Sequence, residues 1–401
     1  MHIGFISSIK WHPYGGSEEL WVQTAKLAIE KDIDVSACFV RPAVSHPVWS
    51  DLERSGVRMF HPPSSTSLAT RVASRLGALS YRFGERLREN ARLAPFRSFF
   101  NAKPDVVVIN EGGGIVDPDL FDILRKTMPP LPYLGIFHNN FEHVPADSWR
   151  SGLVQFLRSA ERLLFVADAT LRATERNLAT KLDAARIIRN PVNLAETHSE
   201  PWPDDAIPRF ACVGALDVTR KGQDLAIQAL SARTWRNRDW RLSIFGSGEH
   251  RAYLQELIAF YGLADRVELR GEVRDVRSIW RSHHALLMPS RIESAPLVIV
   301  EAMLCGRPII STDVGGIREW IHDGRDGFLA QAATAEGFGA VLERAWERRH
   351  DWRQMGAFAH ESAICMYDPA PAETLLGIIL AAAKRDAKQP RREELAKAAA
   401  S

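Results

Sequence analysis

The chain has 401 residues, of which 46% are hydrophobic and 25% charged, and its formal net charge is +2. These proportions are those of an average globular protein and exclude a disordered or fibrous chain. The length exceeds what one hydrophobic core usually supports and predicts two domains. So small a net charge gives no reason to expect a nucleic-acid partner.

Short apolar strands alternate with helical segments through both halves of the chain. In the first half we predict strands at His2–Ser7, Val35–Val40, Val106–Asn110, Tyr133–His138 and Leu163–Ala167. In the second half we predict strands at Phe210–Val213, Arg241–Phe245, Val267–Leu269, Ala285–Met288 and Pro308–Ser311. Strands that alternate with helices indicate the α/β class, with a doubly wound parallel sheet in each half.

A polar, proline-rich segment at 196–208 separates the two halves and predicts a linker, because its prolines and acids continue neither element. We place the first domain at 1–193 and the second at 205–367. A helix at about 368–388 follows, and we expect the tail, 389–401, to be frayed helix.

The segment Ser290–Gly316 carries the strongest chemical signal. Pro296 is expected to open a helix that Gly306 closes, so the free N–H groups at Leu297 and its neighbours form a site for a diphosphate. Glu293 and Glu301 offer carboxylates that accept hydrogen bonds from sugar hydroxyls. As isolated residues, these two glutamates would be interpreted as a helix cap and a surface residue.

Further candidates follow other strand ends. Lys221, beside Arg220, can neutralise diphosphate oxygens and stabilise a leaving nucleotide. Gly15-Gly16 precede a helix whose N-terminus favours an anion. The remaining candidates are Gly246 and Val273 in two loops, Ser294 beside Glu293, and His138 at a strand end.

These motifs, in this order, resemble the donor site of the family 4 retaining glycosyltransferases, known also as glycosyl transferases group 1. The resemblance covers nearly the whole chain and is strongest from Val213 to Leu329. It implies the GT-B fold, with two Rossmann-like domains facing a central cleft and the last helix crossing back to the first domain.

The resemblance also implies roles for the candidates. Glu293 lies at the donor sugar, Glu301 binds the ribose, and the backbone near Val273 contacts the base. Gly15-Gly16 face the donor phosphates, and His138 lies near the reacting sugar. We therefore expect His138, Lys221 and Glu293 to be catalytic, and Gly15, Gly16, Arg220, Gly246, Val273, Ser294, Leu297 and Glu301 to bind the donor.

The implied reaction moves a hexose from a nucleoside-diphosphate sugar to a hydroxyl of a glycan, a lipid-linked or a small-molecule acceptor, with retention. Ala215 stands where the family usually has an arginine, so a non-catalytic sugar-nucleotide-binding subunit is an alternative. A nucleotide-sugar 2-epimerase, which shares the two-domain shape, is another. A dinucleotide-dependent dehydrogenase is disfavoured, because no GxGxxG follows the first strand.

Two other features bear on cofactors and location. Asp117 and Asp119 spell DxD in the wrong domain for a metal-diphosphate clamp, so we expect no metal and no cofactor. The run Arg71–Arg97 has seven arginines against two glutamates, which suits either an anionic membrane surface or a solvated helix face.

The remaining sequence indicates a cytoplasmic protein that is soluble or peripheral on the inner face of the plasma membrane. The four cysteines form no CxxC pair, which argues against a zinc site or a disulfide framework. The first residues lack the pattern of a signal peptide, and no uninterrupted apolar stretch is long enough to span a bilayer.

Overall fold

The structure is a computed structural model that describes residues 1–8, 14–40, 46–62, 81–139 and 144–386. It divides into two compact units. The first consists of Met1–Pro191 and the residues from Pro369 onward, and the second is Val192–Asp368. The predicted tail 389–401 and the start of the basic run, 71–80, lie outside the described residues.

The first unit contains a seven-stranded parallel sheet with the order β3-β2-β1-β4-β5-β6-β7. Its elements in chain order are β1 (His2–Ser7), α1 (Gly16–Glu30), β2 (Asp34–Phe39), α2 (Pro47–Arg54), β3 (Arg58–Phe60), α4 (Tyr81–Asn101), β4 (Val106–Glu111), α5 (Pro118–Thr127), β5 (Tyr133–Phe137), α6 (Asp147–Arg158), β6 (Arg162–Phe165), α7 (Asp168–Leu178), β7 (Ala185–Ile187) and α16 (Pro371–Asp386).

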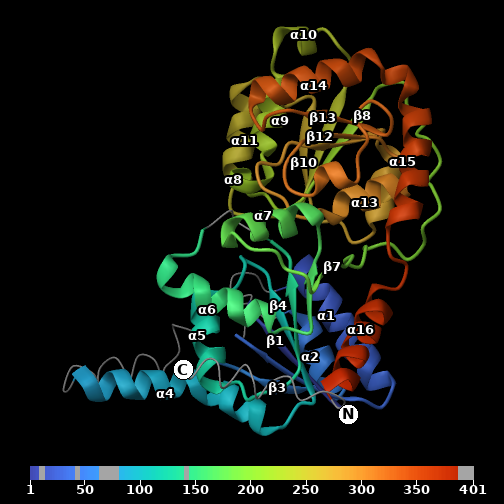
Figure 1. Cartoon of the computed structure of the whole chain (residues 1–401). Coiled ribbons are helices and arrows are strands. Elements are labelled where there is room, and N and C mark those ends of the chain that lie inside the picture. The colour runs from blue at the N-terminus through green and yellow to red at the C-terminus, as the bar shows by residue number, and fades with distance from the viewer. Residues whose placement is uncertain (9–13, 41–45, 63–80, 140–143, 387–401) are drawn as a thin grey trace. The chain divides into compact units, whose positions relative to one another are not determined.

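Helices cover both faces of this sheet (Figure 1). One core is built from α4, α5 and α6 against the central strands, with Phe99, Phe121 and Leu153 among its buried side chains. On the opposite face α1 and α16 pack against each other and against β4. The last helix of the chain therefore belongs to the first unit.

The second unit contains a six-stranded parallel sheet with the order β10-β9-β8-β11-β12-β13. Its elements are β8 (Arg209–Val213), α8 (Val218–Lys221), α9 (Gln223–Leu230), α10 (Arg233–Arg236), β9 (Arg241–Phe245), α11 (Arg251–Phe260), β10 (Val267–Gly271), α12 (Val276–Ser282), β11 (Ala285–Met288), α13 (Leu297–Leu304), β12 (Ile309–Thr312), η1 (Ile317–Glu319), β13 (Gly327–Ala330), α14 (Ala335–Glu347), η2 (Arg349–Asp351) and α15 (Trp352–Met366).

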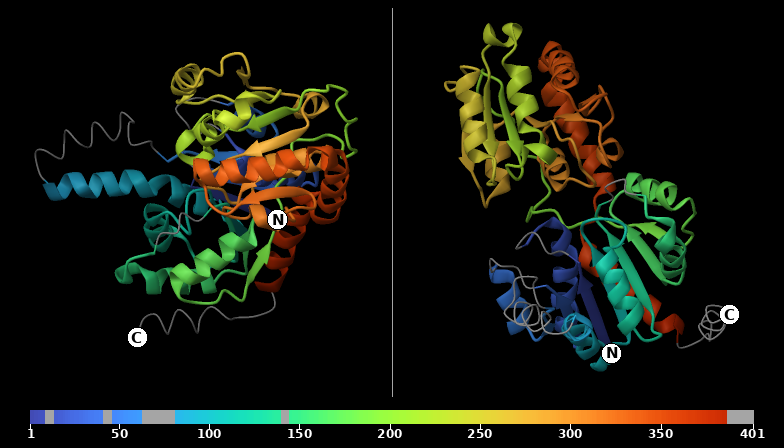
Figure 2. Two further views of the ribbon diagram at one scale, coloured as in Figure 1. Left: turned by 90° about the horizontal axis from the view of Figure 1, so that it is seen from above. Right: turned by 90° about the vertical axis from the view of Figure 1, so that its left-hand side faces the viewer.

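Two hydrophobic cores lie on the two faces of this second sheet. One contains buried residues of α9, α11 and α14, and the other contains those of α12, α13 and part of α15. The helix layers on either side of both sheets can be followed in Figure 2. Each unit is thus a doubly wound α/β sandwich, as the alternation of strands and helices predicts.

The ten predicted strands are all present, with ends that move by a few residues, but β3, β7 and β13 were not predicted. Each of the three lies at an edge of its sheet. In β7 two of the three residues are exposed. Edge strands this short need no continuous apolar run, so the sequence gives little signal for them.

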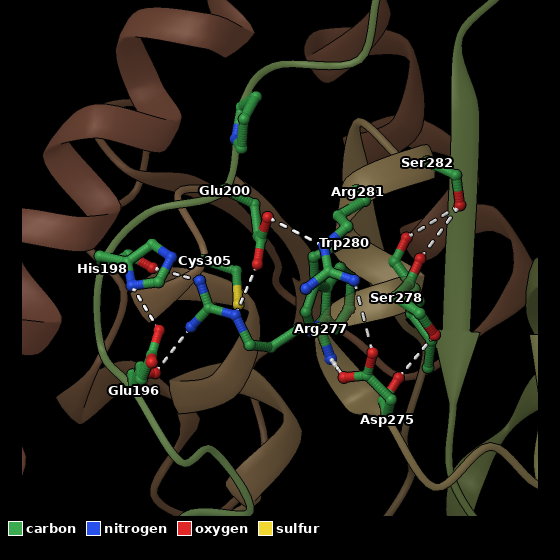
Figure 3. Close-up of polar contacts among 12 residues, drawn as sticks. Glu196, His198, Glu200, Asp275, Arg277, Ser278, Trp280, Arg281, Ser282 and Cys305 are labelled. Atoms are coloured by element: carbon green, nitrogen blue, oxygen red, sulfur yellow. Dashed lines mark hydrogen bonds and ion pairs between the residues drawn. The ribbon is translucent and has the colours of Figure 1, made fainter.

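The predicted linker, 196–208, is not a free connection, because its first part packs on the second unit (Figure 3). The Arg277 guanidinium donates hydrogen bonds to the carbonyl oxygens of Glu196 and His198, at 2.7 and 2.9 Å. It also contacts the Glu200 carboxylate at 2.5 Å. We call residues 196–201 the linker strap.

A second buried arginine holds the end of the linker strap. Arg307, only 1% exposed, donates hydrogen bonds to the carbonyl oxygens of Glu200 and Pro201, at 3.2 and 2.6 Å. It also donates to the carbonyl oxygens of Trp280 and His283, each at 2.9 Å through Nε. A guanidinium has five N–H donors that need acceptors when they are buried. The strap provides some of these acceptors and is therefore part of the packed structure of the second unit.

Candidate functional site

Both sheets have a point at which the chain reverses its direction of travel across the sheet. In the first unit this point lies between β1 and β4, and in the second between β8 and β11. Doubly wound sheets bind ligands in the crevice outside the carboxyl ends of such strands. The predicted site residues fall beside these two points, and they form one cluster in each unit.

The β8/β11 cluster consists of Lys221, Ser290 and Glu293. The Lys221 ammonium, at the end of α8, lies 2.6 Å from Glu293 Oε1. Ser290 Oγ donates to the same oxygen at 2.9 Å. The Glu293 side chain is 7% exposed and that of Lys221 27%. The Lys221 side chain is therefore partly open to solvent, whereas that of Glu293 is buried.

A bidentate ion pair fixes the loop that carries Glu293. Arg291 contacts both carboxylate oxygens of Asp224, in the first turn of α9, at 2.7 Å each. Its guanidinium also donates to the Val218 carbonyl at 2.6 Å, and its backbone N–H to the Arg220 carbonyl at 2.7 Å. Paired planar groups of this kind add geometric precision as well as binding energy.

A close backbone approach fixes the other side of the same loop. Gly315 has φ of +59°, and a Cβ there would lie 1.9 Å from the Glu293 carbonyl oxygen. The neighbouring Gly316 donates its N–H to the Ser294 carbonyl at 2.8 Å. A side chain at 315 would displace the segment that carries the Glu293 carboxylate.

The helix α13 begins at Leu297, with Pro296 as its N-cap and no side-chain cap hydrogen bond. Its first N–H groups face the loop of Glu293 and Ser294, because the amides of a helix point toward its N-terminus. Uncapped amides and the helix dipole favour an anion at this position. The prediction that Pro296 and Gly306 delimit this helix agrees with the observed bounds.

Glu301 lies within α13 and is not a surface residue. It is 6% exposed, and burial raises the pKa of its carboxyl group to about 7. The Asn193 backbone N–H donates to Oε1 at 3.3 Å. A buried carboxyl group held by so few donors is typical of a functional position rather than of a stabilising one.

Four other candidates of the second unit have individual environments. Arg220 is ion-paired with Asp217 at 2.6 Å, so its guanidinium already has an anionic partner. Gly246 has φ of +131°, and a Cβ there would lie 2.0 Å from the Gly214 carbonyl oxygen. Val273 is half-buried against the second core, and Ser294 is buried.

Two sets of acidic residues would suggest a metal site from their composition alone. Asp217, Glu249 and His250 bring ligand atoms within 4.8 Å of one another, but Asp217 accepts hydrogen bonds from Thr219 and Arg220. In the first unit, Asp117 of the DxD sequence caps α5. The Asp217 and Asp117 carboxylates thus already accept hydrogen bonds from their own helices or loops.

The β1/β4 cluster consists of Ser7, Glu18, Asn110 and His138. The His138 Nε2 lies 2.8 Å from Asn110 Oδ1, and Asn110 Nδ2 donates to Glu18 Oε2 at 3.0 Å. Ser7 Oγ donates to Glu18 Oε1 at 2.9 Å. Burial lowers the pKa of His138 to about 3 and raises that of Glu18 to about 7.

The loop Gly15-Gly16 precedes α1 in the same crevice. Gly15 is the N-cap of α1 with an extended backbone, φ of −169°, and Gly16 is the first helical residue. A Cβ at Gly15 would meet no described atom within 4 Å. The fold of the described residues therefore does not require glycine at position 15.

Several residues of the two clusters were not predicted. Asn110 lies near the end of β4 and Ser290 follows β11, and a polar residue at the carboxyl end of a buried strand is a signal that could have found them. The ion pair of Arg291 with Asp224 joins residues that are 67 positions apart. No local pattern reveals such a contact.

Residues 207–348, most of the second unit, match the model of the family described as Glycosyl transferases group 1. The second unit therefore carries the sequence pattern of this family. An exopolysaccharide phosphotransferase of Streptomyces coelicolor is 26% identical over 365 residues, 87% of this chain and 37% of the relative. A D-inositol 3-phosphate glycosyltransferase of Streptomyces scabiei is 31% identical over 215 residues, 48% of this chain and 47% of the relative.

The chain spans only about a third to a half of the length of these curated relatives. Among solved structures, HepE of Anabaena in complex with UDP superposes with a TM-score of 0.70 at 18% identity, over 95% of this chain and 100% of that chain. At such identity the likeness shows the fold, which is GT-B as the sequence predicts.

Proposed function

We propose that this protein is a group 1 glycosyltransferase that moves a hexose from a nucleoside-diphosphate sugar to an acceptor hydroxyl, with retention at the anomeric carbon. The observation that carries the proposal is the contact of Lys221 with Glu293 beside the uncapped start of α13. This contact brings a partly exposed lysine side chain, a buried carboxylate and a helix N-terminus together at the point between β8 and β11 where the chain reverses direction.

The donor would bind along this crevice. Its diphosphate lies at the first amides of α13 and within reach of the Lys221 ammonium, and its ribose hydroxyls donate to Glu301. The base contacts the backbone near Val273, and Gly246 borders it. HepE of Anabaena has been solved with UDP and with UDP-glucose, which supports a donor of this class.

The state of Glu293 argues against a covalent intermediate. Its Oε1 accepts hydrogen bonds from both Lys221 and Ser290, which lowers the nucleophilicity of that oxygen. We therefore favour a front-face reaction. The bond from the anomeric carbon to the diphosphate breaks, the acceptor oxygen bonds to the same face, and its proton passes to the departing phosphate.

Lys221 would stabilise the leaving group. As charge develops on the diphosphate, the ammonium can share its donors between Glu293 and the phosphate oxygens, because it has three. In the first unit we assign His138 and Gly15-Gly16 to the same reaction, on the resemblance described above. We assign no metal and no cofactor to these steps.

The location and the acceptor are part of the proposal. We propose a cytoplasmic enzyme whose acceptor is a glycan, a lipid-linked or a small hydroxyl compound, with peripheral attachment through Arg71–Arg97 as a testable extension. Among the described residues one segment, Arg349–Lys384, is long and apolar enough to cross a membrane, because it contains an 18-residue window with a mean hydropathy of 1.2. Length and composition are its only support, and it includes the non-helical turn between α15 and α16.

The decisive experiment is a transfer assay with UDP-, GDP- and ADP-sugars and a mixed panel of acceptors. Lys221→Met should lower kcat/KM by about 100-fold to 1000-fold, as loss of one donor to a developing anion usually does. Lys181→Met is the matched control, because Lys181 also contacts a glutamate at 2.6 Å but lies outside both clusters. The anomeric configuration of the product is read by NMR.

Three outcomes would contradict the proposal. Binding of nucleotide sugars without transfer or hydrolysis across the panel would favour a non-catalytic subunit, for which Ala215 is the sequence argument. Conversion of the donor into another nucleotide sugar, without any acceptor, would indicate an epimerase. An equal loss in Lys221→Met and Lys181→Met would remove Lys221 from the mechanism.

A further inference from the structure

The side-chain amide of Asn110 has only one possible orientation. Its Nδ2 lies 3.1 Å from the Ser17 backbone carbonyl and 3.0 Å from Glu18 Oε2. A carbonyl oxygen only accepts hydrogen bonds, so the Asn110 nitrogen must face Ser17. The Asn110 oxygen must then face His138, whose Nε2 lies 2.8 Å away.

This orientation determines which ring nitrogen of His138 carries the proton. An amide oxygen cannot donate, so the short contact requires a hydrogen on Nε2. Complete burial keeps the ring neutral over the ordinary pH range, because the pKa is lowered to about 3. A neutral ring with a hydrogen on Nε2 has its lone pair on Nδ1.

We infer that Asn110, held by Ser17 and Glu18, is a positioning residue that fixes His138 as the Nε2–H tautomer and makes Nδ1 a hydrogen-bond acceptor. The glycine loop and the histidine, which the sequence presents as separate candidates, are thus joined through one amide. His138 cannot act as a general acid in this state. Its Nδ1 can accept a hydrogen bond from a hydroxyl.

The surroundings of Nδ1 agree with a role as an acceptor. Among the described residues Asn190 Nδ2 contacts Nδ1 at 3.5 Å, which is long for a hydrogen bond. Asn190 Oδ1 is buried and has no hydrogen-bond partner among the described residues. A weakly engaged Nδ1 and an unsatisfied oxygen on the neighbouring amide each suit a donor group, and a sugar hydroxyl provides one.

Glu18 is the outer support of this arrangement. Its oxygens accept from Ser7 Oγ, Trp21 Nε1 and Asn110 Nδ2, at 2.9, 3.1 and 3.0 Å. A glutamine could replace it without loss of these contacts. Its amide nitrogen would face the Ser7 hydroxyl, which can accept, and its oxygen would face Trp21 and Asn110.

The tautomer is tested by NMR on the full chain labelled with 15N-histidine, with His138→Gln used to assign the signal. The wild type should show a protonated Nε2 and an unprotonated Nδ1. Asn110→Leu and Glu18→Leu should shift the signal toward the other tautomer or a mixture, whereas Glu18→Gln should leave it unchanged. A protonated Nδ1 in the wild type, or an unchanged signal in Asn110→Leu, would overturn the inference.

The catalytic consequence rests on the proposed function and is measured separately. Asn110→Leu should lower kcat about tenfold with a smaller change in the KM for the donor, and Glu18→Gln should restore kcat relative to Glu18→Leu. A purely structural role would lower the melting temperature of both Glu18 variants without this split. If the tautomer is as expected but no transfer occurs, the proposed function fails and the assignment of the tautomer stands.

Discussion

The two clusters occupy the same topological position in two sheets but differ in charge. In the β8/β11 cluster the Glu293 carboxylate contacts the ammonium of Lys221, whose side chain is 27% exposed. In the β1/β4 cluster His138 and Asn110 are buried, and the hydrogen bonds that Glu18 accepts from other described residues come from neutral groups. The topology thus provides the crevice, and the residues at the strand ends determine its chemistry.

The two clusters therefore suit different chemical groups of a ligand. The β8/β11 cluster can attract and neutralise a diphosphate, because it offers a cation and helix amides. The β1/β4 cluster offers fixed dipoles and an oriented lone pair, which suit recognition of neutral hydroxyl groups. The two crevices also differ in their glycines, because a side chain would overlap neighbouring backbone at Gly315 but would meet open space at Gly15.

Gly315→Ala should have the largest effect, because it tests whether the β8/β11 cluster depends on backbone contact. The new Cβ would overlap the Glu293 carbonyl oxygen at a φ of +59°, so we expect a loss of about 3 kcal/mol in stability. Thermal and denaturant unfolding measure it. Gly262→Ala is the control, with φ of +66° and open space, and should cost about 1 kcal/mol. Equal losses would mean that φ alone matters.

Gly15→Ser tests the opposite expectation for the β1/β4 crevice. The extended backbone accepts any residue, and serine is a better N-cap than glycine, so the melting temperature should be unchanged or higher. Transfer should nevertheless fall about tenfold to 100-fold, since the space beside Gly15 would be needed by the ligand. Unchanged kcat/KM would show that no ligand approaches this loop.

The effect of Glu301 on nucleotide binding is the smallest of those we predict, and it depends most on pH. Because ribose hydroxyls would donate to the ionised carboxylate, binding at a pH below the raised pKa of about 7 requires loss of a proton. The Kd for a nucleoside diphosphate should therefore rise about tenfold from pH 8 to pH 6, about fivefold of it between pH 7 and pH 6, and be nearly constant above pH 8. Calorimetry in buffers of different ionisation enthalpy would detect the released proton.

Glu301→Gln is the control for this pH dependence, and its stability checks the sign. The raised pKa means that the folded unit binds the proton more tightly than the unfolded chain. The stabilisation is therefore complete below about pH 4.5 and is lost as the pH rises through about 7. The variant should be more stable than the wild type at pH 8 and not at pH 5. A pH-independent difference would contradict the assigned pKa.

Much of the fold could be predicted because central strands leave a clear apolar signal. The ten predicted strands include every central strand of both sheets, whereas the short edge strands β3, β7 and β13 escaped. The helix between Pro296 and Gly306 was predicted from its punctuation, since proline and glycine act locally. The packing of the linker strap could not be predicted, because it depends on arginines about a hundred positions away.

The candidate residues divide in the same way. Sequence order identified Lys221 and Glu293, and the structure places them 2.6 Å apart. Sequence order did not reveal that Glu301 is buried or that Arg220 is ion-paired with Asp217. It also did not reveal that Asn110 connects His138 to the residues that follow Gly15-Gly16. Those properties depend on tertiary contacts, which no single motif encodes.

The linker strap determines where this protein can be divided. A junction placed at 205, after the strap, would remove the strap acceptors of the buried Arg277 guanidinium and the two strap carbonyl oxygens that Arg307 contacts. A junction near Val192 keeps them. Exchange of donor-binding domains between enzymes of this family, by an engineer or by recombination, should therefore succeed only when the strap travels with the domain that it completes.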